Sequence, residues 1–428
     1  MDLDSRSRTS LRPDSVTWLT IYLVVLFAIP SRLVVGPLGS AGTPSMLLGL
    51  ASIGAWLLMR LGAWRQVRTQ INPLGIAMLC FLFSVCVSYA LAMSRPIISD
   101  EVSPADVAIL SLLSWSGTLL LARDIPSRDR LQTLVWRVAI AGGLVGLLGM
   151  AQFVTRRVLI DVISIPGLIS TRDSFAYFRD SRIRPSGTAI HPLEYGVILT
   201  ILLPIALHVA FHHRTRPLVV RWFPAIALGG VIAISSSRTT YLAALVGIAI
   251  CMLGWTARQR KIVIGLTVGG LLALVTVIPR LFTSIFNLFT GLSDDPSITS
   301  RTDSFTIAWH FLAQHPLFGR GLGTLLPRYR IFDNQYLLLL VSTGVIGTAL
   351  FVGFLLTALL PLIRVRRIPQ DNDTHDLAVS LIASIVAGAL SLAFFDMFSF
   401  PMTMGCLFLI IGIGGALSRQ VLTTAEMP

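Results

Sequence analysis

The sequence contains little charge for its length. Only 13% of its 428 residues are charged and 54% are hydrophobic, and the mean hydropathy is +0.77. A soluble globular domain carries roughly 25% charged residues, so this composition excludes that class. The sequence therefore predicts a polytopic membrane protein.

Lysine is almost absent, because Lys261 is the only one in the chain. Arginine therefore supplies nearly all of the formal charge of +13 and is the only abundant strong cation for a binding site. Basic residues in the cytoplasmic loops of a membrane protein produce such an excess without nucleic-acid binding. We therefore expect no nucleic-acid partner.

Cysteine is also scarce. The four cysteines all fall in apolar runs: Cys80, Cys86, Cys251 and Cys406. They indicate neither a disulfide framework nor a thiolate metal site. The amino-terminal segment Met1–Val16 is polar and has no clear cleavage site, so we expect the first apolar run to be retained as an anchor.

About twelve segments are apolar over the ~20 residues that a helix needs to cross a membrane. They lie near 17–35, 44–60, 73–92, 105–122, 131–154, 190–211, 222–236, 239–256, 262–279, 334–361, 376–396 and 401–418. With both termini in the cytoplasm, every short inner loop carries arginine or lysine, as the positive-inside rule requires. The expected fold is all-α, with the whole chain, 1–428, as one membrane domain.

Two stretches on the expected outer side are long, at about 155–190 and 280–333, and both carry several arginines. Loops of this length within a compact protein are usually functional or disordered, and their apolar pieces argue against disorder. We expect them to form an outward-facing cap of amphipathic helices.

The second stretch contains the segment 301–336, which resembles neither a span nor a short connector. Ser300 and Asp303 resemble a capping box for an amphipathic helix that Pro316 should end. The glycine-rich turn around Arg320 follows, and Asp333 then precedes the next span. Asp333 suits a helix N-cap, and in the same position it could accept a proton from an acceptor hydroxyl.

Two further motifs place arginine at the outer surface. Arg184 precedes His191 and Glu194 at the start of the sixth span, and it reads either as a headgroup anchor or as an anion site. The His191–Glu194 spacing alone is a weak metal signal. Arg238 lies in a serine- and threonine-rich turn between two spans, where it either snorkels to the surface or joins helix N–H groups in binding a phosphate.

These motifs together resemble the O-antigen ligase and O-antigen polymerase superfamily of bacterial membrane glycosyltransferases. The resemblance rests on the span count, on the run from Arg184 to Pro192, on the turn at Arg238, and on 301–334, and its motifs cover roughly 170–360. Where the ligases typically carry a histidine before Asn334, this sequence has Asp333. That departure favours a polymerase, or a ligase for another acceptor.

The resemblance implies a polymerase in the cytoplasmic (inner) membrane whose site faces outward. It would transfer a lipid-linked oligosaccharide from a polyprenyl diphosphate, such as undecaprenyl diphosphate, to an acceptor sugar hydroxyl by inverting displacement, without metal or cofactor. Asp333, Arg238 and Arg184 are the expected catalytic residues. The expected substrate contacts are Arg301, Asn334, His191, Glu194, Arg320 and Tyr336. Asp396, near the outer end of the eleventh span, is a secondary candidate.

Three other functions remain open at this stage, one of which is a scaffold within a polysaccharide assembly complex. A ligase would transfer the glycan to lipid A-core or another acceptor, and a flippase would only move the lipid-linked oligosaccharide across the membrane. The sequence shows neither internal repeats nor interrupted helices, which are typical of transporters. The expected partners are the glycan donor and acceptor, membrane lipids and other polysaccharide-assembly proteins.

Overall fold

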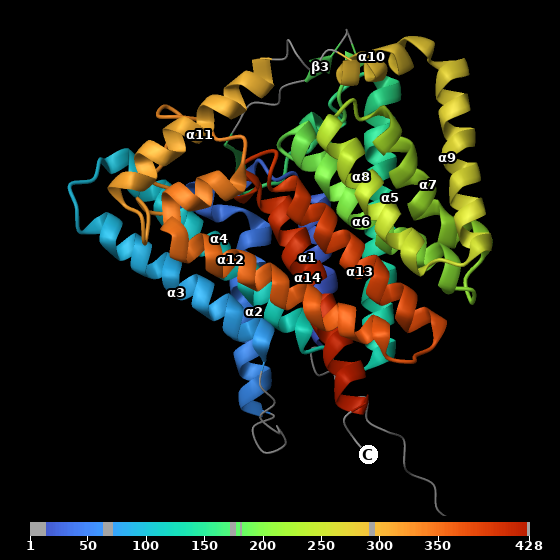
Figure 1. Cartoon of the computed structure of the whole chain (residues 1–428), viewed down its shortest axis with the longest axis horizontal. Helices are drawn as coiled ribbons and strands as arrows, with labels where there is room; N and C mark the ends of the chain where they lie inside the picture. Colours follow the sequence, from blue (N-terminus) through green and yellow to red (C-terminus); the bar gives the residue numbers. More distant parts are fainter. Residues whose placement is uncertain (1–13, 63–71, 172–176, 180–181, 291–295, 426–428) are drawn as a thin grey trace, which may run out of the picture.

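The computed structural model describes residues 14–62, 72–171, 177–179, 182–290 and 296–425, and this part of the chain is mostly helical (Figure 1). The first half contains α1 (Ser15–Ala28), β1 (Leu33–Val35), η1 (Gly36–Gly42), α2 (Pro44–Gly62), α3 (Pro73–Met93), α4 (Ser99–Arg123), α5 (Arg128–Thr155), η2 (Leu159–Val162), β2 (Leu168–Ser170), β3 (Phe178–Arg179), β4 (Arg182–Ile183) and α6 (Pro192–His212). The second half contains α7 (Leu218–Ile234), α8 (Arg238–Gly254), α9 (Ala257–Val277), α10 (Pro279–Thr290), α11 (Pro296–Gln314), α12 (Gln335–Arg367), α13 (Asn372–Ser391), η3 (Met397–Ser399) and α14 (Pro401–Ala425).

Each of the twelve predicted spans coincides with a helix, which confirms the all-α polytopic fold. Within the described ranges, nine helices are long and apolar enough to cross a membrane, and α1, α7 and α8 are shorter apolar helices. Two helices end well before the predicted span does. The first span stops at Ala28, just before Pro30, and the eleventh stops at Ser391, where the chain turns into η3.

Helix α6 lies at the centre of the bundle. In its membrane-spanning window, 94% of the residues are buried inside the protein, compared with 6% for α9, which stands at the edge (Figure 1). Buried residues of α5, α13 and α14 belong to the same hydrophobic core as those of α6. Residues at either end of α6 are therefore held by neighbours on several sides, and such fixed positions suit a site.

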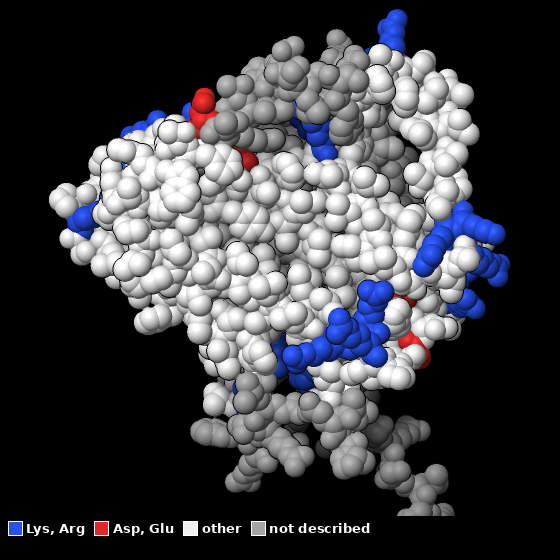
Figure 2. Space-filling view, viewed as in Figure 1, with Lys and Arg blue, Asp and Glu red and all other residues white. Residues whose placement is uncertain are grey.

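One end of the bundle is tied together by ion pairs and hydrogen bonds between helix ends. Arg128 at the start of α5 pairs with Asp373 of α13 at 3.0 Å, and Arg419 of α14 donates to the Arg123 carbonyl at the end of α4. In Figure 2 most visible basic side chains lie towards this lower end and along the right-hand edge, below a broad uncharged band. The band is the surface expected to face lipid.

The two long stretches lie at the opposite, upper end (Figure 1). In the first, β2 pairs antiparallel with β1, which joins it to the connection between α1 and α2. The second contains α10, α11 and the glycine turn. The predicted capping box was wrong, because α11 begins at Pro296 and Ser300 lies inside it. Proline suits the first helical turn, where its missing N–H costs no hydrogen bond.

Helix α12 is interrupted, which the sequence analysis did not anticipate. Gly344 has φ +67° and ψ −171°, so the helical hydrogen-bond pattern breaks there. The chain before and within the glycine turn fills the break: Arg320 N–H donates to the Val341 carbonyl and Val345 N–H to the Pro316 carbonyl. Backbone groups freed inside a membrane protein need such partners.

Candidate active site

The turn that carries Arg184 is fixed by α5 and α1. The Gln152 side chain of α5 accepts from the Ser186 and Gly187 N–H groups and donates to the Gly187 carbonyl. The Thr188 hydroxyl donates to the Phe27 carbonyl at the end of α1. Gly187 is required, since its φ is +57° and an added Cβ would lie 2.5 Å from the Tyr195 ring. Arg184 therefore lies two residues before a rigid turn.

His191 is the N-cap of α6. Its Nδ1 accepts from Leu193 N–H at 3.1 Å, so the neutral ring carries its proton on Nε2. Burial, together with the nearby Arg184 guanidinium, lowers the pKa of His191 to about 4. His191 is therefore uncharged at neutral pH and suits hydrogen bonding more than proton transfer.

Glu194 occupies a structural position one turn further along α6. It is fully buried, and its carboxylate accepts from the Met402 N–H at the start of α14 and from the Ile190 N–H. A negative charge at a helix N-terminus is favourable. The predicted substrate contact remains a prediction, but these bonds favour a bracing role.

The turn at Arg238 combines two unfavourable features. Ser236 has φ +49°, which is uncommon for a residue with a side chain, and Arg238 is the first residue of α8, where a cation opposes the helix dipole. The Ser237 hydroxyl caps α8 by accepting from Thr240 N–H. An anion bound at this N-terminus would offset the second cost.

The starts of α6 and α8 lie against each other. An added Cβ on Gly196 of α6 would lie 2.1 Å from the Thr240 hydroxyl of α8. Only glycine permits this approach, which sets the turn at Arg238 beside the first turns of the helix that follows Arg184 and His191. The segments of Arg184 and Arg238, which are 54 residues apart in the sequence, thus share one end of the bundle.

The start of α12 differs from the prediction in one detail. Asn334, not Asp333, is the N-cap, and its side-chain oxygen accepts from the Tyr336 and Leu337 N–H groups at 2.9 and 3.2 Å. Asn334 has the extended backbone that an N-cap requires. Because Asn334 caps α12, the carboxylate of the half-buried Asp333 is not used as the cap. Tyr336 donates its hydroxyl to the Ala389 carbonyl.

The connection between α13 and α14 links these segments. Gln335, which is fully buried, donates its N–H to the Leu392 carbonyl and accepts from Phe398 N–H. Phe400, at the far side of the same connection, contacts the His191 ring at 6.4 Å between centroids. The starts of α6, α8, α12 and α14 therefore converge at the upper end of the molecule.

A cavity of about 510 Å³ opens beside this convergence. It is lined by Arg330, Asp396 and Ser31, and also by Ile190 and Phe332, the neighbours of His191 and Asp333. Its wall is otherwise largely apolar, as in a site for a lipid-linked ligand. Asp396, the secondary candidate, thus faces the cavity. Arg330 lines it as well.

Arg320 is held by an ion pair. Its guanidinium lies 2.7 Å from Glu101 of α4 and over the Tyr329 ring, and Glu101 is only 1% exposed. Close contacts explain the glycines on either side, because an added Cβ would lie 2.4 Å from the Ser342 carbonyl carbon at Gly319 and 2.6 Å from Ala92 Cβ at Gly321. Arg320 stays a predicted substrate contact, while its geometry favours bracing the turn. Arg301 lies within α11, and its side chain is outside the described part of the chain.

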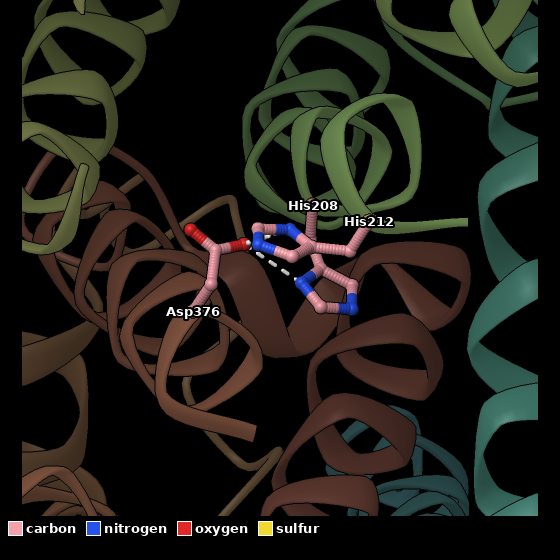
Figure 3. A group of neighbouring side chains, drawn as sticks. All are labelled: His208, His212 and Asp376. Carbon is pink, nitrogen blue, oxygen red and sulfur yellow. Dashed lines mark hydrogen bonds and ion pairs between the residues drawn. The ribbon is translucent and has the colours of Figure 1, made fainter. Parts of the chain in front are cut away.

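Sequence reasoning missed one group at the lower end. His208 and His212 of α6 and Asp376 of α13 form, among the described residues, a group able to hold a metal ion (Figure 3). The His-x-x-x-His spacing in α6 was the available signal, but the carboxylate comes from a helix 164 residues further along the chain and only packing brings it there.

Residues 223–352 match the family model described as O-antigen ligase. A search of curated proteins gave no match. The matched segment contains the turn at Arg238, the amphipathic helix α11, the glycine turn and Asp333, and it ends beyond the break in α12. The resemblance stated from the sequence motifs is therefore confirmed.

Proposed function

We propose that this chain, whose residues 223–352 match the O-antigen ligase family model, is a glycan polymerase that uses a polyprenyl-diphosphate-linked oligosaccharide as donor. Two observations support this proposal most directly: the start of α8 packs against the start of α6, and residues next to His191 and Asp333 line the 510 Å³ cavity. The family match implies a glycan transferase in general, and the choice of polymerase, the donor and the mechanism are our proposal.

In this mechanism Arg184 and Arg238 bind the diphosphate of the donor. A departing lipid diphosphate gains negative charge, and fixed guanidinium groups neutralise it through paired hydrogen bonds. The rigid turn below Arg184 and the helix start at Arg238 hold both cations in place before the donor arrives. The apolar wall of the cavity accommodates the first part of the polyprenyl chain.

Asp333 accepts the proton of the acceptor hydroxyl as that oxygen attacks the anomeric carbon. The C–O bond to the diphosphate breaks as the new glycosidic bond forms, so a direct displacement inverts the anomeric centre. Asn334 fixes the first turn of α12, which sets the backbone that carries Asp333. His191, neutral at pH 7, supplies a hydrogen bond to a sugar or phosphate oxygen.

The arginine distribution supports an orientation with the lower end in the cytoplasm and the converging helix starts on the outer face of the inner membrane. The lower end carries the basic last turn of α12, at Arg364, Arg366 and Arg367, and Arg60 in the last turn of α2. The α10 and α11 region would then cover the site on the outer side.

The test is transfer by the purified protein in lipid nanodiscs, supplied with a lipid-linked donor and a glycan acceptor. A polymerase forms a new glycosidic bond to a second lipid-linked glycan and releases free polyprenyl diphosphate. Extension of lipid A-core alone would identify a ligase. Donor movement between leaflets without bond formation would identify a flippase and contradict the enzyme proposal.

A further inference from the structure

Three side chains meet where α6 and α13 end at the lower side of the molecule. His208 and His212 are one turn apart on α6, and Asp376 is in the second turn of α13. Both imidazoles face the carboxylate in Figure 3. His208 Nδ1 lies 2.7 Å and His212 Nδ1 3.1 Å from Asp376 Oδ2. Each residue offers a ligand atom within 4.8 Å of the other two.

The group is largely buried, with His212 partly exposed, and it is incompletely hydrogen-bonded. His208 is fully buried and Asp376 is 3% exposed. Within the described part of the chain, the second carboxylate oxygen, Asp376 Oδ1, has no hydrogen-bond partner, and His212 Nδ1 is close to the carboxylate without hydrogen-bonding geometry. Burying a carboxylate in the membrane part of a protein costs free energy unless a cation or donor compensates it. Two imidazole nitrogens that point towards one carboxylate are a ligand set typical of a metal site.

The surroundings of His208 fit the same interpretation. Metal-bound histidines usually direct the second ring nitrogen to a carboxylate, which fixes the ring. His208 Nε2 lies 3.5 Å from Asp373 Oδ1. Asp373 is itself held by Arg128 at 3.0 Å and by Gln132 at 2.6 Å. The Asp373 carboxylate is therefore positioned to orient the His208 ring through its second nitrogen.

A path for an ion leads to the group from outside. A cavity of about 680 Å³ is lined by His212 and Asp376, together with Arg214, Arg221 and Arg258. Imidazole nitrogens favour an ion of the zinc class over a hard cation, with water from the cavity in the remaining coordination position.

We propose that His208, His212 and Asp376 bind one divalent transition-metal ion, Zn²⁺ by the preference of two imidazoles and one carboxylate. The ion links α6 to α13 at the end of the bundle opposite the proposed transfer site. Its function is structural: it compensates Asp376 and fixes the end of the central helix. The proposal is independent of the glycan chemistry.

The test uses the full chain without a histidine tag, stripped with a chelator and then equilibrated with Zn²⁺. Mass spectrometry of bound metal should find about one ion per chain, the stoichiometry of a three-residue site. His212→Gln and Asp376→Asn should each weaken zinc binding by about tenfold or more. His310→Gln, at an exposed histidine of α11, is the matched control and should bind as the wild type does.

A second measurement does not depend on how the variants fold. Co²⁺ added to the stripped wild-type protein should give the visible absorption of a low-symmetry nitrogen and oxygen site, and Zn²⁺ should displace it and raise the melting temperature. Absence of this absorption, or zinc binding that is equal in His212→Gln, His310→Gln and wild type, overturns the proposal. The trio would then be a hydrogen-bonded network.

Discussion

Replacing Arg238 by alanine should separate activity from stability. Arg238 is the first residue of α8, and its charge opposes the helix dipole. Removing a cation from that position is worth about 0.3–1 kcal/mol in favour of the helix. The Ser237 cap remains, so we expect the variant to melt at the wild-type temperature or slightly above it.

Transfer should respond in the opposite direction. If Arg238 neutralises the charge that develops on the diphosphate, its loss resembles removal of one preorganised transition-state donor, which costs about 10²–10³ in rate. The assay is the initial rate of transfer by purified protein at saturating acceptor, with melting measured on the same samples. Arg238→Lys should recover only part of the rate, since an ammonium group lacks the paired geometry.

Arg280→Ala supplies the matched control. Arg280 is also an arginine in the first turn of a helix near the upper end, but it is exposed on α10. Its replacement should leave the rate unchanged. Wild-type transfer by a well-folded Arg238→Ala protein, or an equal loss in Arg280→Ala, would refute the assignment of Arg238 to the diphosphate.

Three further predictions concern the frame of the site. Glu101→Gln should lower stability by about 3 kcal/mol, measured by thermal melting, because it leaves the Arg320 guanidinium without its buried partner; an unchanged melting point contradicts this. Gly344→Ala should lower both the melting temperature and the activity, since φ is +67° and a Cβ would lie 2.3 Å from the Leu317 carbonyl carbon. Gly353→Ala in the same helix is the control: its Cβ meets open space, so it should change neither the melting temperature nor the activity. The pH–rate profile of His191→Gln should have the wild-type shape between about pH 5 and 8, because the pKa of about 4 keeps the His191 ring neutral there; an activity limb present in the wild type and missing in the variant would contradict this. The same lowered pKa means that His191 contributes stability above its unfolded pKa of about 6.5, and that this stability is lost as the pH falls towards 4.

Hydropathy predicted the helices because twenty apolar residues have few alternatives in a membrane. It did not predict how helix ends are made. Proline moved the start of α11 to Pro296, and Asn334 replaced Asp333 as a cap, although either residue type is suitable there. The break at Gly344 could not be predicted from the sequence, because a glycine in an apolar run is common. The break becomes evident only from the hydrogen bonds that the glycine-turn segment makes with α12.

The site motifs were visible from the sequence because arginine on the expected outer side opposes a strong bias. Their convergence could not be read from spacing, since it depends on Gly196 admitting α8 and on Gln335 tying α12 to the connection before α14. The group at His208 and Asp376 was missed for the same reason. Contacts between distant helices carry no local signature.

Donor binding and transfer measured together in Asp333→Asn test the central claim most directly. With a lipid-linked donor in nanodiscs, the account predicts that Asp333→Asn binds the donor as tightly as the wild type but loses about 10²–10⁴ in transfer rate, the usual contribution of a positioned base. Arg238→Ala should instead lose donor binding as well. Undiminished transfer by Asp333→Asn would show that the carboxylate does not take the acceptor proton.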